Sequence, residues 1–243
     1  MTTTGTSSNS AIVRPTAEAL AAFAVRLGFK TVTPSLLAAL THRSAAANAR
    51  ESNERLEFLG DALLSSFVAR FLLEALPPDT DEGTLSRARV AVIRRETLAE
   101  AARGLGVADL LVVGNGERRA GRHTHDGLLA DAYEALVGAM FLDQGDADAD
   151  RFLSETLAGP LAAVAASPPV PDPKTALQMR LQAEGQTLPL YRTVSEEGSG
   201  HDHTFTVEVV AADGTVLGRG AGSNKRIAQT AAARAALGQV DNR

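Results

Sequence analysis

The chain has 243 residues, of which 44% are hydrophobic and 22% are charged, a balance typical of folded globular proteins with one or two domains. It has no cysteine, which excludes a disulfide scaffold, a cysteine nucleophile and any Cys-ligated zinc or iron–sulfur site. The net charge of −5 is unevenly spread: residues 174–243 hold 8 basic and 7 acidic residues, whereas residues 1–173 hold 16 basic and 22 acidic ones.

The first residues predict neither a targeting signal nor a membrane anchor. Residues 1–13 begin with a Ser/Thr-rich stretch, and we expect them to form a disordered tail. They lack the basic and apolar segments of a secretory signal, and no run of 18 apolar residues predicts a transmembrane helix. We therefore expect a cytoplasmic protein with no membrane partner.

Up to residue 166 the sequence favours helices and shows no comparable strand pattern. Helices are predicted over residues 16–27, 52–76, 82–105, 128–142 and 151–166. The following segment, residues 167–173, has four prolines in seven residues and predicts an extended, semi-rigid linker. We therefore expect an all-α domain over residues 14–166.

After the linker the predicted order is α-β-β-β-α. Helices are predicted over residues 174–184 and 224–237, with strands over 191–195, 204–210 and 216–220 between them. An Asp-Gly pair joins the last two strands in a hairpin turn, and Asn224 is positioned to cap the final helix. We expect a small α+β domain over residues 174–240.

Three acidic residues share one face of the second predicted helix. Glu54, Glu57 and Asp61 follow i,i+3 and i,i+4 spacing, whereas the neighbouring leucines point elsewhere. The local cations Arg55 and Arg70 do not sit on that face. A solvated helix face is one interpretation, but the apolar neighbours indicate a helix that is packed on most sides.

Two more acids lie in the most apolar predicted helix. Asp131 and Glu134 are the only charged residues in the range 127–142, where ionised groups are costly unless arginines or a metal compensate them. Together with Glu57 and Asp61 they offer four carboxylates, which select magnesium or manganese over zinc. A divalent ion there would polarise a phosphoryl oxygen and acidify water for attack on a phosphodiester. A di-iron site is disfavoured because no histidine follows a glutamate by three residues.

The segment Glu54-Arg-Leu-Glu-Phe-Leu-Gly-Asp61 resembles the signature of ribonuclease III, the double-strand-specific RNA endonuclease. The segments Glu82-Gly-x-Leu-Ser86 and Leu129-Ala-Asp-x-x-Glu-Ala-Leu-x-Gly138 match the same family. The resemblance runs over about residues 14–240 and implies a magnesium-dependent hydrolase, with manganese as a possible substitute, that needs no small-molecule cofactor.

The resemblance also implies roles for the acidic residues. Glu57, Asp131 and Glu134 match magnesium ligands, and Asp61 and Glu134 match the residues most closely tied to catalysis. The implied products carry 5′-phosphates, 3′-hydroxyls and two-nucleotide 3′ overhangs. The implied role is the processing of ribosomal precursor RNA and of some messenger RNAs.

Three further residues of the helical domain match family positions. Glu54 and Glu82 match supporting acidic positions near the site. Phe58 matches an aromatic residue that packs into the partner subunit of a homodimer, and an ordinary core phenylalanine is the alternative.

The C-terminal domain resembles a double-stranded-RNA-binding domain. Its final helix is predicted to begin with two cations, and a helix N-terminus with added positive charge suits phosphates. Such domains read the shape of about 16 base pairs of RNA duplex. The resemblance implies that the RNA-binding residues are Lys174, Gln178, His201, Asn224, Lys225 and Arg226.

Three alternatives stay open at this point, of which a helical metal-binding enzyme acting on small phosphoesters does not explain the C-terminal domain. His123 and His125 stand where the family commonly has a basic, serine-containing run, and we interpret them as part of a surface loop rather than as metal ligands. A duplex-RNA-binding protein with an inactive nuclease fold is the rival function. Its mark would be the loss of one of the four helix acids, and all four are present.

Overall fold

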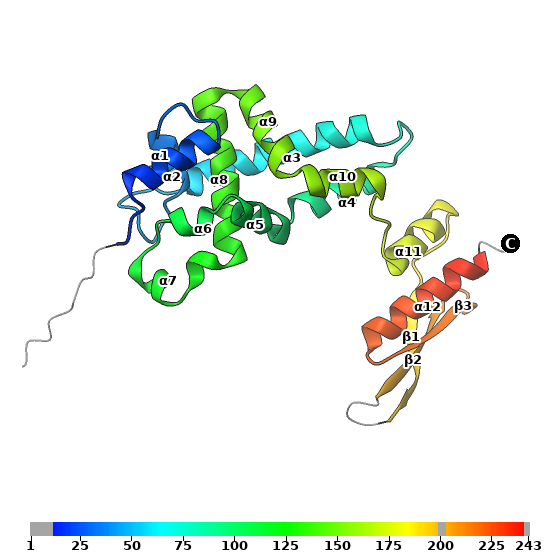
Figure 1. The fold of residues 1–243 in the computed structure, drawn as a ribbon. Helices are drawn as coiled ribbons and strands as arrows, with labels where there is room; N and C mark the ends of the chain where they lie inside the picture. The colour runs from blue at the N-terminus through cyan, green and yellow to red at the C-terminus, as the bar shows by residue number, and fades with distance from the viewer. Residues whose placement is uncertain (1–11, 199–202, 241–243) are drawn as a thin grey trace, which may run out of the picture. The chain divides into compact units, whose positions relative to one another are not determined.

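A computed structural model describes residues 12–198 and 203–240 of the chain (Figure 1). The chain divides into two compact units, residues 1–169 and 170–243. The tail predicted for residues 1–13 lies almost wholly outside the described residues, and so does His201.

The regular elements described in the first unit are helices, and a parallel bridge joins Thr41 to Val112. The helices are α1 (Ala17–Arg26), α2 (Pro34–Ala39), α3 (Glu54–Ala75), α4 (Glu82–Ile93), α5 (Arg95–Gly104), α6 (Val107–Leu110), α7 (Asn115–Arg119), the 3-10 helix η1 (Arg122–Thr124), α8 (Asp126–Gln144), α9 (Asp146–Thr156) and α10 (Ala158–Ala166).

Helix α8 runs through the middle of this unit (Figure 1). From Leu129 to Met140 every residue is buried except Asp131 and Glu134, which are half-buried. Helices α2, α3, α5 and α9 pack around it and share its hydrophobic core. The two carboxylates are therefore carried by the most enclosed helix of the unit.

Two glycines let α3 and α8 cross with their backbones in contact. A Cβ added to Gly60 would lie 1.8 Å from the carbonyl oxygen of Glu134, and a Cβ added to Gly138 would lie 2.4 Å from that of Leu56. No larger residue fits either position unless the helices move apart. The crossing brings the turn of α3 that carries Glu57 against the turn of α8 that carries Glu134.

The prediction of one continuous helix over residues 82–105 is wrong. Arg94 is extended, with φ −63° and ψ 150°, and it separates α4 from α5. Its carbonyl oxygen accepts the first hydrogen bond of α5, from the backbone N–H of Thr97 at 3.0 Å. The break contains neither glycine nor proline, so the hydrophobic pattern runs through it. The helix predicted over residues 151–166 is likewise divided, at Leu157.

The second unit follows the predicted order. It consists of α11 (Pro173–Ala183), β1 (Leu190–Glu197), β2 (Thr204–Val210), β3 (Val216–Gly222) and α12 (Lys225–Val240). The strands form an antiparallel sheet in the order β1-β2-β3. The Asp-Gly turn is confirmed, because Gly214 has φ +86° and the N–H of Thr215 donates to Asp213 Oδ1 at 2.9 Å.

One small core holds the helices of this unit on the sheet. Leu177 and Leu181 of α11 pack with Val207 and Val209 of β2 and with the buried alanines of α12. Strand β3 lies so close to α12 that a Cβ on Gly220 would be 2.2 Å from a backbone nitrogen of that helix. The close approach of β3 therefore fixes the position of α12 on the sheet.

The predicted fold class, an all-α domain followed by a small α-β-β-β-α domain, is confirmed. None of the helices in the described part of the chain is both long and apolar enough to cross a membrane.

Candidate metal centre and nucleic-acid interface

The crossing of α3 and α8 creates a cluster of three carboxylates. One carboxylate oxygen from each of Glu57, Asp131 and Glu134 lies within 4.8 Å of the others, and all three side chains are half-buried. Glu57 comes from the first turn of α3, and the other two come from α8. Residues more than 70 positions apart in the sequence thus meet in one place.

Asp61 lies beside this cluster rather than within it. It is exposed on the next turn of α3, yet its charge acts on both Glu57 and Glu134. None of the ion pairs in the described residues involves Asp61 or the three clustered carboxylates. The negative charge is therefore not neutralised by a bound arginine or lysine.

Burial raises the pKa values of all three clustered acids, and repulsion by neighbouring carboxylates adds to the rise for Glu57 and Glu134. Burial raises the pKa of Glu134 to about 7, and the charges of Asp61, Glu57 and Asp131 add to the shift. Burial also raises the pKa of Glu57, with repulsion from Asp131 as the next cause. The pKa of Asp131 is raised by burial and lowered by Arg95 and His42. The cluster therefore resists full ionisation unless a cation enters it.

The donor set fits a hard divalent cation. Three carboxylates within reach of one another supply oxygen ligands, and the described residues include no His or Cys in the group. Oxygen ligands of this kind suit magnesium and manganese better than zinc. Glu57, Asp131 and Glu134 would hold the ion, with Asp61 at the edge.

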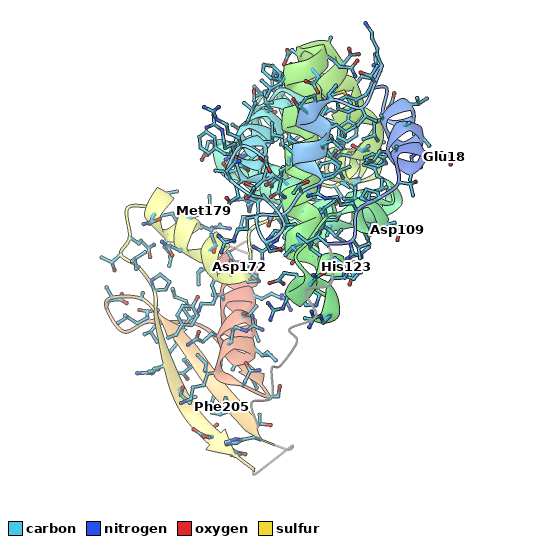
Figure 2. The ribbon with its side chains drawn as sticks, turned by 90° about the vertical axis from the view of Figure 1, so that its left-hand side faces the viewer. Glu18, Asp109, His123, Asp172, Met179 and Phe205 are labelled. Atoms are coloured by element: carbon cyan, nitrogen blue, oxygen red, sulfur yellow. The ribbon has the colours of Figure 1, made fainter. Side chains whose placement is uncertain are left out.

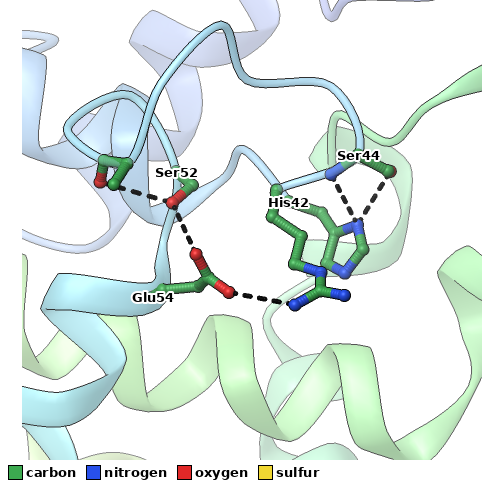
Figure 3. Close-up of polar contacts among 6 residues, drawn as sticks. His42, Ser44, Ser52 and Glu54 are labelled. Atoms are coloured by element: carbon green, nitrogen blue, oxygen red, sulfur yellow. Dashed lines mark hydrogen bonds and ion pairs between the residues drawn. The ribbon is translucent and has the colours of Figure 1, made fainter.

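The other predicted acids have different surroundings. Glu54 is turned toward the loop before α3, where Arg43 Nη1 and Ser52 Oγ both lie 3.4 Å from its carboxylate (Figure 3). Glu82 begins α4 and accepts a hydrogen bond from Ser86 Oγ at 2.7 Å. Phe58 is 82% exposed on α3, so the alternative of an ordinary core phenylalanine does not hold within this chain.

Sequence reasoning missed the cations around the cluster. Arg95 begins α5, is exposed and has no ion-pair partner among the described residues, and its charge lowers the pKa of both Asp131 and Glu134. His42, on the loop before α3, also lowers the pKa of Asp131. Arg43, next to it, pairs instead with Glu54. Nothing in the sequence spacing of Arg95 and His42 signals their place, because only the tertiary fold brings them near Asp131.

The two histidines before α8 lie apart from the carboxylates. His123 is half-buried in η1, near the start of α8 (Figure 2), and His125 is exposed. Neither belongs to the metal-competent group found in the described residues.

In the second unit, three predicted RNA-binding residues line one groove. Lys174 and Gln178 of α11 face Arg226 of α12 across a hollow of about 640 Å³, to which Arg234 adds another cation. Asp172, labelled in Figure 2, caps α11 at the end of this groove by accepting from the N–H of Lys174 at 3.1 Å.

The start of α12 is held by side-chain contacts. Asn224 Oδ1 accepts from the N–H of Ile227 at 3.0 Å, which confirms the predicted cap. Lys225 Nζ lies 5.5 Å from the ring centre of Phe205 on β2, and Lys174 Nζ donates to Gln229 Oε1 at 2.8 Å. The exposed Lys225 and Arg226 and the half-buried Lys174 of α11 therefore bring three positive charges to the first turns of α12.

Comparison with known proteins gives consistent matches to both units. Residues 34–161 match the family described as Ribonuclease-III-like, and residues 173–240 match the double-stranded RNA binding motif. The chain is 44% identical to Ribonuclease 3 of Thiobacillus denitrificans over 202 residues, which is 83% of this chain and 88% of the relative. It is 41% identical to Ribonuclease 3 of Anaplasma marginale over 206 residues, 84% of this chain and 87% of that one.

Among solved structures, the nuclease domain of ribonuclease III from Campylobacter jejuni is similar to this chain. It has a TM-score of 0.52 and 31% sequence identity, and the match covers 56% of this chain and 93% of that domain.

Proposed function

The chain belongs to the ribonuclease III family and is a double-strand-specific endoribonuclease, and from this premise we propose that it hydrolyses RNA duplexes with Mg²⁺ held by Glu57, Asp131 and Glu134. The observation that carries the proposal is the group of three carboxylates whose oxygens lie within 4.8 Å of one another. Mn²⁺, which also prefers oxygen ligands, is expected to substitute.

When bound, a divalent ion supplies positive charge to a phosphoryl oxygen and makes a water acidic enough to attack at neutral pH. The chain contributes the carboxylates that hold the ion and the apolar packing of α8 around them. We assign Asp61 and Glu134 the closest roles in the hydrolysis step. Asp61 is free of ion pairs within the described residues and borders the cluster, where it can orient water and accept its proton.

We further propose that the enzyme acts as a homodimer in which each subunit cuts one strand. Phe58 supports this, because it exposes 82% of its surface on the same helix turn as Glu57. The related structure from Campylobacter jejuni is described as having a region involved in dimer formation. Two offset cuts would leave 5′-phosphates, 3′-hydroxyls and two-nucleotide 3′ overhangs.

The second unit is proposed to hold the duplex. Lys174, Gln178 and Arg226 line the groove between α11 and α12, and Lys225 adds charge at the start of α12. Cations at a helix N-terminus attract phosphates, and the contacts carry little sequence information. The family resemblance supports a cytoplasmic role in processing ribosomal precursor RNA and some messenger RNAs.

A cleavage assay tests the proposal. The full chain is incubated with a long RNA duplex in Mg²⁺ or in excess chelator, and the product ends are mapped. We expect paired cuts with two-nucleotide 3′ overhangs in Mg²⁺ and no cuts in chelator. Equal cutting in chelator would contradict the metal assignment. Duplex binding without fragments at any salt concentration would favour a purely RNA-binding protein.

A further inference from the structure

The loop before α3 is fastened to the segment before α7. The backbone N–H of His42 donates to the carbonyl oxygen of Val112 at 2.9 Å, and the N–H of Gly114 donates to Ser44 Oγ at 2.8 Å. The approach is close, because a Cβ on Gly114 would lie 2.6 Å from the carbonyl oxygen of Ser44. The backbone that carries His42 is therefore held in one place.

The same loop also provides hydrogen-bond partners for one nitrogen of the His42 imidazole. His42 Nδ1 lies 3.2 Å from the backbone nitrogen of Ser44 and 2.8 Å from Ser44 Oγ (Figure 3). The backbone N–H can only donate, so Nδ1 must accept. Ser44 Oγ already accepts from Gly114, which leaves its own proton free to point at Nδ1. The neutral ring therefore carries its proton on Nε2.

The second nitrogen faces the other way. In Figure 3 the side of the ring opposite Ser44 is directed toward the helix drawn below the loop. When protonated, the His42 ring carries a positive charge that, like that of Arg95, lowers the pKa of Asp131 on α8, so the ring lies within electrostatic reach of this carboxylate. His42 is half-buried, so water competes only in part for its Nε2–H.

We propose that His42 is a positioning residue for the metal centre: the loop fixes its tautomer through Nδ1, and its Nε2–H is presented to Asp131, directly or through one water. Carboxylates that ligate a metal are commonly oriented by such an outer hydrogen bond, and loss of that bond costs roughly 10–100-fold in metal affinity or activity. The inference rests on the proposed metal site and adds to it a residue outside the helix acids.

Two substitutions separate the two sides of the ring. The side-chain oxygen of Asn in His42→Asn takes the place of Nδ1, so it keeps the Ser44 contact but removes the donor that faces α8. The amide nitrogen of Gln in His42→Gln takes the place of Nε2, so it keeps that donor and loses the Ser44 contact. His125→Asn, on an exposed histidine outside the cluster, is the matched control.

The primary readout is Mn²⁺ binding to the full chain without RNA, followed by the loss of the free-ion EPR signal. We expect about a tenfold or greater loss of affinity in His42→Asn with an unchanged Tm, a smaller loss in His42→Gln, and no loss in His125→Asn. If His42 serves only to hold the loop, the order of the Mn²⁺ affinities is reversed and the Asn variant binds as well as the unaltered chain. That result would overturn the inference about His42 but not the proposed metal centre. No specific Mn²⁺ binding by the unaltered chain would overturn the proposed metal centre as well.

The tautomer is tested independently of the variants. Two-bond ¹H–¹⁵N spectra of the full chain, with each ring assigned through its own backbone signals, should show the Nε2–H pattern for the neutral form of His42. An Nδ1–H pattern would overturn the inference even if both variants failed to fold.

Discussion

Like charges gather in both units, and the two units hold them in opposite ways. In the helical unit, three carboxylates are half-buried without an ion-pair partner among the described residues, and burial raises their pKa values. In the second unit, Lys225 and Arg226 are exposed at the start of α12. Buried charges cost folding free energy unless a ligand compensates them, so the carboxylate cluster indicates a site for chemistry. Exposed charges at the end of a rigid helix carry no such cost and indicate a binding surface.

The largest effect expected from this contrast is the loss of cleavage in Glu134→Gln. The substitution keeps the shape of the side chain but removes a charged ligand, so we expect cutting to fall by about 10³-fold or more, or about 4 kcal/mol in activation free energy. Binding of an RNA duplex should stay within about twofold, because phosphate contacts dominate affinity. Cleavage rates and gel-shift titrations measure the two quantities.

Glu100→Gln is the matched control, since Glu100 is exposed on α5 and belongs to no carboxylate cluster in the described residues. Equal cutting by Glu134→Gln and Glu100→Gln would mean that the metal ligands are misassigned.

The next effect concerns the helix crossing. In Gly60→Ala the new Cβ meets the carbonyl oxygen of Glu134, so α3 and α8 must separate, and we expect a stability loss of about 3 kcal/mol or more. Gly104→Ala, at the end of α5, meets nothing within 4 Å and should change stability by less than about 1 kcal/mol. Thermal unfolding compares them, and similar Tm values for both would show that the crossing tolerates a wider spacing.

A smaller effect is expected from the exposed cations. Replacing Lys225 and Arg226 by Gln should weaken duplex binding about tenfold at physiological salt and reduce the slope of log affinity against log salt by about 1–2. The cleavage rate at saturating RNA should change little, because the carboxylates are intact. Arg192→Gln is the control. Arg192 lies on β1, and its guanidinium pairs with the carboxylate of Glu208 on β2 at 2.9 Å. An unchanged salt slope in the double variant would remove α12 from the RNA surface.

The smallest expected effect is a pH dependence of metal-induced stabilisation. The pKa of Glu134 is about 7 in the folded chain and 4.5 as an ordinary glutamate in the unfolded chain. Between these two values the folded chain keeps a proton that the unfolded chain has lost. This contribution to stability is therefore fully present below about pH 4.5, declines as the pH rises from 4.5, and is lost by about pH 7. Because Mg²⁺ needs the ionised carboxylate, its binding adds little below pH 6 and more above pH 7.

Tm measurements with and without Mg²⁺ follow this effect. At about 100 times Kd the ion adds about 2.7 kcal/mol, and we expect the Tm increase to be larger at pH 8 than at pH 6. Glu134→Gln should abolish the difference, and a Tm increase that is independent of pH would contradict the shifted pKa.

The sequence predicts most of the fold and the identity of the acids for local reasons. Asp131 and Glu134 are conspicuous because they are the only charges in an apolar helix, and Asn224 is recognisable as a cap from its position alone. The break at Arg94 is invisible, since no glycine or proline marks it. The sequence predicts that Asp61 joins the other three acids in one site, whereas in the structure it lies exposed at the edge of their cluster.

What the sequence could not predict depends on contacts between distant segments. Arg95 and His42 reach α8 only through tertiary packing, and no spacing rule connects either of them to Asp131. The same holds in the second unit, where Lys174 meets Gln229 across 55 residues. Periodicity identifies the face of a helix on which a residue lies, but not which residue from another segment packs against it.

The central claim is that the α3–α8 carboxylates hold a divalent ion, and an anomalous difference map from crystals of the full chain grown with Mn²⁺ tests it most directly. The account predicts a strong peak bounded by Glu57, Asp131 and Glu134. A map with no peak there, with Arg95 instead forming ion pairs to Asp131 and Glu134, would contradict it.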